Sequence, residues 1–270
     1  MQAGQASETA RRVAAYRVSF PRLSAPYGDA AADERLSRDV AGSSSSAGSM
    51  RAYLEARTRF FDRVVLGAID AGIDQVVVGA AGYDGRALRY AKPGVRWFEV
   101  DHPDTQLDKR KRIATLGIDA AHVRFVPTDF DTDPLGPALL DAGLDPVRPG
   151  LFLLEGVAVY LSRPTLEWVL SQLHDVAGPG SRLAISLSVS GGSESVTARR
   201  AAFRDGVAAL GEPVRNAVTP EERDSLLAST GWRVVPPRAG SDATDGSDAT
   251  DGADGSERAR AAGLVVAVPA

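Results

Sequence analysis

The chain has 270 residues, 44% hydrophobic and 24% charged, which is enough for one sizeable core. Its net charge of −4, from 31 basic and 35 acidic residues, argues against a nucleic-acid partner, which a basic excess would favour. It has no cysteine, so disulfides and thiolate chemistry are excluded, and no apolar run approaches the roughly 18–20 residues of a membrane span. We therefore expect a soluble cytoplasmic protein with no membrane partner.

Residues 1–49 are expected to form an N-terminal helical cap or lid that is not part of the main sheet. Short helices are predicted over residues 7–16 and 33–40, and residues 42–49 (GSSSSAGS) read as a flexible Gly/Ser break. A segment of this kind either folds over a ligand or serves as a plain connector.

Residues 50–71 predict a long helix, because apolar side chains recur every three or four positions and Gly72 can end it. Its basic residues are expected mostly to face water. They are Arg51, Arg57, Arg59 and Arg63.

The segment 75–101 carries the most informative pattern. A short apolar run leads into four small residues (79–82), a helix over 84–90 and a second apolar run that ends in Asp101. This order is typical of a nucleoside site at the carboxyl edge of a parallel sheet. Asp101 follows Gly79 by 22 positions, about the spacing at which a second-strand acid binds ribose hydroxyls. The glycine pattern alone is weak evidence, because it departs from G-x-G-x-x-G.

The remainder of the chain continues as alternating strands and helices. A helix over 102–116 contains the basic run 109–112, which is expected to be a solvated face. The sequence predicts further strands at 123–127, 150–154 and 183–189, further helices at 137–142, 163–177, 196–210 and 220–230, and a final antiparallel pair at 232–236 and 264–269. The low-complexity stretch 238–262 is expected to be a disordered hairpin loop. Alternating strands and helices predict an α/β fold with a parallel sheet covered on both faces.

Five segments together resemble the leucine carboxyl methyltransferase family. They are Arg57-Thr58-Arg59 with Asp62, residues 80–86 (AAGYDGR), residues 98–103 (FEVDHP), Asp129-Phe130, and residues 154–156 (LEG) with Tyr160-Leu161. The resemblance implies a class I methyltransferase domain over 50–270, with a Rossmann-like sheet of seven strands and an antiparallel C-terminal hairpin. It also implies S-adenosyl-L-methionine as cofactor and S-adenosyl-L-homocysteine as product. Ala80 departs from the family's Gly-Ala-Gly, and an alanine can serve there if its φ is negative.

The resemblance also implies cofactor-binding roles. Arg57 would pair with the cofactor's carboxylate, and the turn formed by Gly79, Ala81 and Gly82 would lie close to its methionyl part. Asp101, followed by His102, would accept hydrogen bonds from both ribose hydroxyls. The structural alternatives are a surface arginine, a plain turn, and an aspartate that caps the next helix.

Two further strand ends complete the expected site. Asp129 would accept the adenine amino group while the Phe130 N–H meets a ring nitrogen, and a simple turn aspartate is the alternative. Glu155 would face the cofactor's ammonium or the reacting centre. Asp84 and Arg86 would either form a bracing ion pair or contact the ligand, and Tyr160 would line the acceptor pocket or simply pack.

No catalytic residue is certain, and Glu155, Tyr160 and His102 are the weak candidates; no metal site is predicted. A carboxylate acceptor has a pKa near 4 and needs no base, whereas a phenol or enol needs one. The absence of a clear base therefore favours in-line O-methylation of a carboxylate on a small molecule or peptide. The resemblance implies that the substrate belongs to a bacterial specialised-metabolite pathway. A hydroxyl or phenol O-methyltransferase, an NAD-dependent dehydrogenase and a catalytically silent nucleoside-binding module are the alternatives. Oligomeric state is not predicted.

Overall fold

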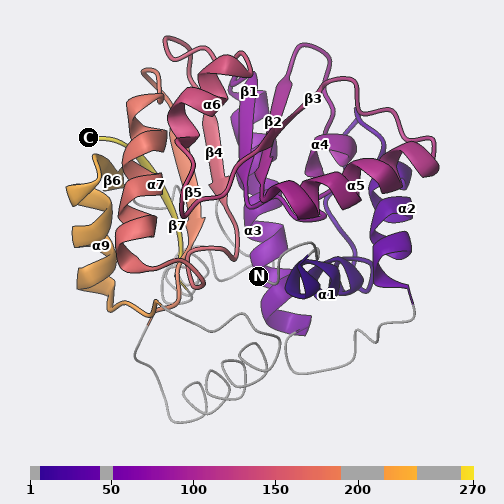
Figure 1. The fold of residues 1–270 in the computed structure, drawn as a ribbon, viewed down its shortest axis with the longest axis horizontal. Coiled ribbons are helices and arrows are strands. Elements are labelled where there is room, and N and C mark those ends of the chain that lie inside the picture. The colour runs from indigo at the N-terminus through magenta and orange to yellow at the C-terminus, as the bar shows by residue number, and fades with distance from the viewer. Residues whose placement is uncertain (1–6, 43–50, 190–215, 236–262) are drawn as a thin grey trace, which may run out of the picture.

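A computed structural model describes residues 7–42, 51–189, 216–235 and 263–270 (Figure 1). Its centre is a seven-stranded sheet of order β3-β2-β1-β4-β5-β7-β6. The strands are β1 (Gln75–Gly79), β2 (Arg96–Asp101), β3 (Val123–Pro127), β4 (Leu151–Leu154), β5 (Arg182–Ser186), β6 (Trp232–Val234) and β7 (Leu264–Pro269). β1 to β5 are parallel, and β7 runs antiparallel to both β5 and β6. The predicted Rossmann-like sheet with its antiparallel C-terminal hairpin is confirmed.

Helices cover both faces of the sheet, because successive side chains of a strand point to opposite sides. One face packs against α3 (Arg51–Asp70) and α4 (Arg86–Arg89) through the side chains of Val76, Val78 and Trp97. The other face packs against α6 (Leu135–Asp141), α7 (Arg163–Asp175) and α9 (Pro220–Ser229) through Val77 and Phe98. β4 is buried along its whole length, as its uninterrupted apolar sequence predicts.

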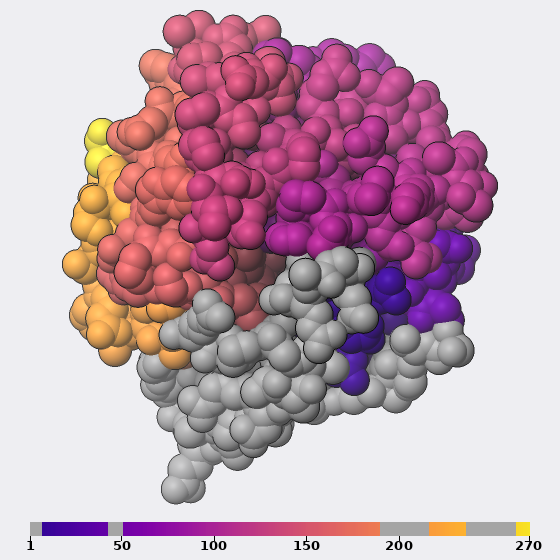
Figure 2. Space-filling view, in the orientation of Figure 1, coloured from indigo at the N-terminus to yellow at the C-terminus, as the bar shows by residue number. Residues whose placement is uncertain are grey.

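The N-terminal segment forms two helices, α1 (Glu8–Arg17) and α2 (Ala30–Ala41). Both helices pack with α5 (Pro103–Thr115) around a third apolar cluster that includes Leu36 and Ile113. The Ser7 N–H donates to Thr105 Oγ1 at the start of α5, and the indigo α1 lies beside the magenta α5 in Figure 2. The cap is therefore attached directly to the parallel half of the sheet.

Two elements are shorter than the sequence predicts. α4 is one turn, since the Asp84 side chain accepts the Arg86 N–H at 2.8 Å and the preceding residues form a turn. β5 ends at Ser186, although Val189 still makes an isolated bridge to Val218. The predicted helix 196–210, the loop 238–262 and most of the Gly/Ser break 42–49 lie outside the described residues. Over the described part of the chain, no helix combines the length and apolar content needed to cross a membrane.

Trp232 couples the C-terminal hairpin to the core. It is fully buried, its Nε1 donates to Leu170 O at 2.9 Å, and its ring packs edge-on against Phe152 and His174. We expect Trp232→Ala to lower the free energy of unfolding by about 3–5 kcal/mol, because it leaves a large cavity. Trp168→Ala on the exposed side of α7 is the matched control, with an expected loss below about 1 kcal/mol. Equal losses in urea titrations of the two variants would show that the hairpin is not part of the cooperative core.

Candidate functional site

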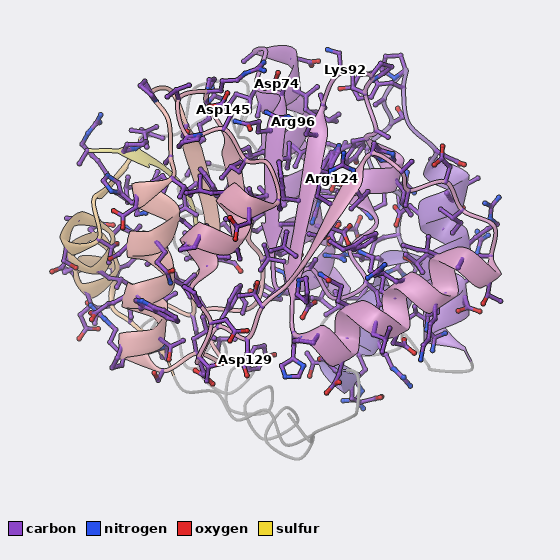
Figure 3. All side chains as sticks on the ribbon, turned by 45° about the horizontal axis from the view of Figure 1, so that its top comes forward. Asp74, Lys92, Arg96, Arg124, Asp129 and Asp145 are labelled. Atoms are coloured by element: carbon purple, nitrogen blue, oxygen red, sulfur yellow. The ribbon has the colours of Figure 1, made fainter. Side chains whose placement is uncertain are left out.

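The strand register brings the predicted site residues to one edge of the sheet. Gly79 at the end of β1 pairs with Val100 on one side and Leu154 on the other, and Asp101 pairs with Pro127. Strand order reverses between β1 and β4, the position where α/β sheets bind ligands at their carboxyl ends. In Figure 3, Asp129 lies at this carboxyl edge, at the opposite end of the strands from Asp74 and Asp145.

The turn after β1 is closely packed. A Cβ on Gly79 would lie 2.6 Å from Leu154 Cδ2, and one on Gly82 would lie 2.9 Å from Ala10 Cβ in α1. Gly82 also has a φ of +51°, which disfavours other residues. Ala81 is buried and donates its N–H to Val100 O at 3.0 Å. The turn is therefore held between β2 and the N-terminal cap.

Ala80 does not have the negative φ that was expected for an alanine at this position. An alanine is unstrained there only with a negative φ, but the structure gives Ala80 a φ of +50°. In this left-handed conformation the Cβ crowds the following carbonyl, at a cost of roughly 1–2 kcal/mol. It is the one non-glycine residue with positive φ in the described part of the chain.

Asp101 is oriented by the turn beside it. Its Oδ1 accepts the His102 N–H at 2.7 Å, and its Oδ2 accepts the Gly82 N–H. Burial raises the pKa of Asp101, while these two N–H groups oppose the rise. Each oxygen retains a further lone pair, so the carboxylate can still accept bonds from a ligand's hydroxyls. The helix-cap alternative for Asp101 is wrong, because His102 is the N-cap of α5 and its Nδ1 accepts the Asp104 N–H.

Glu155, the first residue after β4, is surrounded by guanidinium groups. Arg57 Nε lies 3.0 Å from its Oε1, and Arg86 Nη1 lies 2.6 Å from its Oε2. Arg17 of α1 approaches the same Oε2 to 3.3 Å. Burial alone would raise the pKa of Glu155, but Arg86, Arg17 and Arg57 hold it well below its usual range. The structure thus brings the predicted Arg57 and Glu155 together and pairs them with each other.

Arg86 is the centre of a buried ionic network. Its Nη1 lies 2.5 Å from Asp84 Oδ2, and its Nε lies 2.7 Å from Asp62 Oδ1 on α3. Its Nη2 donates to Thr58 O at 3.2 Å, and the side chain is fully buried. The ion pair expected between Asp84 and Arg86 is therefore present.

The cap contributes two arginines that sequence reasoning missed. Arg17 lies 3.2 Å from Asp84, and Arg22 binds both oxygens of Asp62 at 2.7 Å. Arg22 also reaches Asp33 on α2 at 3.2 Å. The sequence gives no sign of these two ion pairs, because neither arginine belongs to a motif. Their partners Asp84 and Asp62 are also remote in the chain.

One alternative and one expectation about basic side chains are wrong. Arg57 is 7% exposed, so the alternative that it is a surface arginine is excluded. Lys109, placed in a solvated run, is 1% exposed and lies 2.6 Å from Glu99 on β2. Helical periodicity explains the burial of Lys109, because Lys109 lies one turn before the buried Ile113 on the inward face of α5.

The remaining predicted residues lie at the more exposed part of the edge. Asp129 Oδ1 accepts the Asp131 N–H at 3.0 Å, the turn contact that was its structural alternative. Asp129 Oδ2 also lies 3.9 Å from His102 Nε2, so these two predicted residues meet. Phe130 is buried, and its N–H has no acceptor among the described residues. Tyr160 lies in a turn three residues before α7, and its N–H donates to Val157 O.

The chain is similar to proteins of known family. The family model described as leucine carboxyl methyltransferase matches residues 12–174. A Parafrankia sp. protein is 42% identical over 137 residues, covering 50% of this chain and 44% of that protein. A Saccharopolyspora erythraea protein is 34% identical over 194 residues, covering 68% and 65%. Both names contain "putative S-adenosyl-L-methionine-dependent methyltransferase". The chain spans about half the length of the curated relatives it matches.

The fold also matches a solved structure over nearly its whole length. A crystal structure of a "putative methyltransferase" from Thermobifida fusca YX gives a TM-score of 0.61 at 20% identity, covering 98% of this chain and 94% of the other. At this identity the match supports the fold alone.

Ala80 gives a test of the strained turn. We expect Ala80→Gly to raise the free energy of unfolding by up to about 1 kcal/mol, because glycine removes a strain of roughly 1–2 kcal/mol and adds about 0.5–1 kcal/mol of chain entropy. Ala81→Gly is the control; Ala81 has no positive φ, so the same change should destabilise. Urea unfolding at pH 7 measures both, and a destabilised Ala80→Gly would contradict the assigned strain.

The ionic network makes the free energy of unfolding depend on pH in the acidic range. Burial alone would raise the pKa of Asp62, but Arg22 and Arg86 lower it to about 2. Because this pKa is below that of the unfolded chain, the stabilisation is complete above about pH 5 and is lost as the pH falls towards 2. We expect Asp62→Asn, which is less stable at neutral pH, to lose about 2 kcal/mol less than the wild type between pH 5 and 2.

Asp70→Asn, at the exposed end of the same helix, is the control and should keep the wild-type pH profile. Urea titrations at several pH values measure the slopes. Parallel profiles for Asp62→Asn and the wild type would rule out this contribution of Asp62.

Proposed function

This chain belongs to the leucine carboxyl methyltransferase family, and from that premise we propose that it is an S-adenosyl-L-methionine-dependent O-methyltransferase acting on a carboxylate. One observation carries the proposal. The Asp101 carboxylate, the tight turn at Gly82 and the ion pair of Arg57 with Glu155 lie along one carboxyl edge, at the reversal of strand order. This combination supplies a ribose acceptor, close backbone approach and two opposite charges for an amino-acid head group.

The residues fit the cofactor group by group. Asp101 would hold the ribose hydroxyls, and Asp129 with the Phe130 N–H would hold the adenine edge, since that N–H has no acceptor among the described residues. Arg57 would bind the methionyl carboxylate and Glu155 the ammonium. When bound, the cofactor supplies a methyl group made electrophilic by its sulfonium.

The amino-acid head group matches the charges already paired in the site. Arg57 Nε and Glu155 Oε1 are 3.0 Å apart and both side chains are buried. Removing one partner of such a pair is costly, because the other charge is left without compensation. A zwitterion brings one charge of each sign, so it can replace this contact without leaving either residue unpaired. A ligand that lacks the amino group or the carboxylate would leave either Glu155 or Arg57 without a partner for its charge if it displaced this contact.

The described residues favour an acceptor that needs no general base. Glu155 is held ionised by three arginines, and its lowered pKa makes it a poor base. Two histidine ring nitrogens are already engaged in contacts with the backbone, so neither is a free base. His102 Nδ1 accepts a backbone N–H, and His122 Nε2 contacts Ala87 O at 2.6 Å. A carboxylate is already ionised at neutral pH, so the protein need only orient its oxygen and exclude water. Orientation of this kind can lower the activation barrier by roughly 7–11 kcal/mol.

We place the acceptor among small-molecule or peptide carboxylates of bacterial specialised metabolism. Two findings support this placement, the bacterial sources of the relatives named above and the carboxyl chemistry in the family's name. Family membership also favours S-adenosyl-L-methionine over NAD as the nucleotide ligand.

Calorimetric titration tests the proposal. We expect the purified chain to bind S-adenosyl-L-methionine and not NAD, and Asp101→Ala to raise the Kd at least about 10-fold, since charge-assisted hydrogen bonds contribute about 1.5–3 kcal/mol. Asp141→Ala, at the exposed end of α6, should leave the Kd unchanged.

Transfer of labelled methyl to matched carboxylic and phenolic acceptors then tests catalysis. Label on carboxylic acids alone is the expected result. Preference for NAD, or an unchanged Kd in Asp101→Ala, would refute the proposal, and binding without transfer to any acceptor would favour the silent module.

A further inference from the structure

Lys109 is buried next to the proposed cofactor site and has no place in the mechanism above. Its side chain is 2% exposed, and its Nζ lies 2.6 Å from Glu99 Oε2, which is itself 3% exposed. Burying an ammonium costs several kcal/mol unless it is paired and hydrogen-bonded, so this position needs a structural or functional reason.

The Lys109 ammonium connects the turn after β1 to β2. Besides Glu99 on β2, Lys109 Nζ donates to the backbone carbonyl of Asp84 at 2.6 Å. Asp84 lies two residues after Gly82, whose N–H donates to Asp101. The turn after β1 is thus joined to β2 through the Asp101 carboxylate, through the Ala81 N–H to Val100 O and, by way of the Asp84 carbonyl and Glu99, through Lys109.

Glu99 and Asp101 point to the same side of β2, because side chains two positions apart share a face. Lys109 therefore sits beneath Asp101 on the side that α5 covers. The same helix also holds the strand directly, since Gln106 Nε2 donates to Glu99 O at 2.9 Å. Movement of Lys109 would free the turn to shift relative to the carboxylate.

We propose that Lys109 is a positioning residue for cofactor recognition, which acts through Asp101 by fixing the turn after β1 against the end of β2 and by placing a positive charge behind the ribose-binding carboxylate. This inference rests on the proposed function. Lys109 itself is too deeply buried to touch the ligand, so its effect is transmitted.

The charges around Asp101 support this role. The charged groups that act on it are Glu99 on the same strand, Lys109 on α5 and His102 at the start of α5. Burial raises the pKa of Asp101, and Lys109 and His102 counter that rise. Without Lys109 the Glu99 carboxylate would lose its ion-pair partner, and Asp101 would take up a proton at a higher pH. A protonated carboxyl is a weaker acceptor for ribose hydroxyls.

A double-mutant cycle separates this role from a purely structural one. The Kd of S-adenosyl-L-homocysteine is measured by calorimetry for the wild type, Lys109→Met, Asp101→Asn and the double variant at pH 6 and 8. We expect Lys109→Met to raise the Kd about 10- to 100-fold in the wild-type background and less than about 3-fold in the Asp101→Asn background. The loss should be larger at pH 6 than at pH 8.

Two further variants control for folding. Lys111→Met, exposed on the same helix, should keep the wild-type Kd and Tm. Glu99→Gln combined with Lys109→Met removes both buried charges, so it should keep a higher Tm than Lys109→Met alone while still binding weakly.

The outcomes are distinguishable. If the wild type binds the ligand and the effects of Lys109→Met and Asp101→Asn multiply independently, the inference about Lys109 fails and the proposed function stands. An unchanged Kd in the folded Glu99→Gln/Lys109→Met variant also overturns the inference. A wild type that does not bind S-adenosyl-L-homocysteine overturns the proposed function and this inference together.

Discussion

The Arg86 guanidinium is the interaction on which the geometry of the candidate site depends. It is fully buried and pairs with Asp62 on α3, Asp84 in the turn after β1 and Glu155 after β4. A planar guanidinium offers five donors in fixed directions, so it can satisfy three carboxylates from three elements at once. Charges buried this deeply are tolerated only when each is compensated, and the site is therefore held in one arrangement.

The sheet topology explains why the ionic groups gather at this edge. β1 lies between β2 and β4, and the chain leaves these neighbouring strands towards opposite faces of the sheet. The strands are buried on both faces, and an acid stands at the end of β2 (Asp101) and directly after β4 (Glu155). Both acids therefore lie at the edge of the sheet where a nucleoside would bind.

The N-terminal cap is held at this edge by ion pairs as well as by packing. Arg17 extends from the cap to Asp84 and Glu155, Arg22 extends to Asp62 on α3, and Ala10 lies against Gly82. The turn below it includes Ala80 in a left-handed conformation. Strain of that kind persists only where surrounding contacts determine the backbone, as they do here on both sides of the turn.

The sequence by itself determined the sheet, because apolar runs of strand length alternate with helical periodicity over most of the chain. It also made Asp101 and Glu155 candidates, since an acid at the end of a buried strand is a local signal that needs no knowledge of distant residues. Only the tertiary structure decided which charges meet. Lys109 looked solvated within a basic run, and Arg17 carried no motif, yet both are buried against acids that belong to other elements of the fold. Burial and pairing depend on three-dimensional packing between remote segments, and one-dimensional patterns record the periodicity of a residue but not its partner.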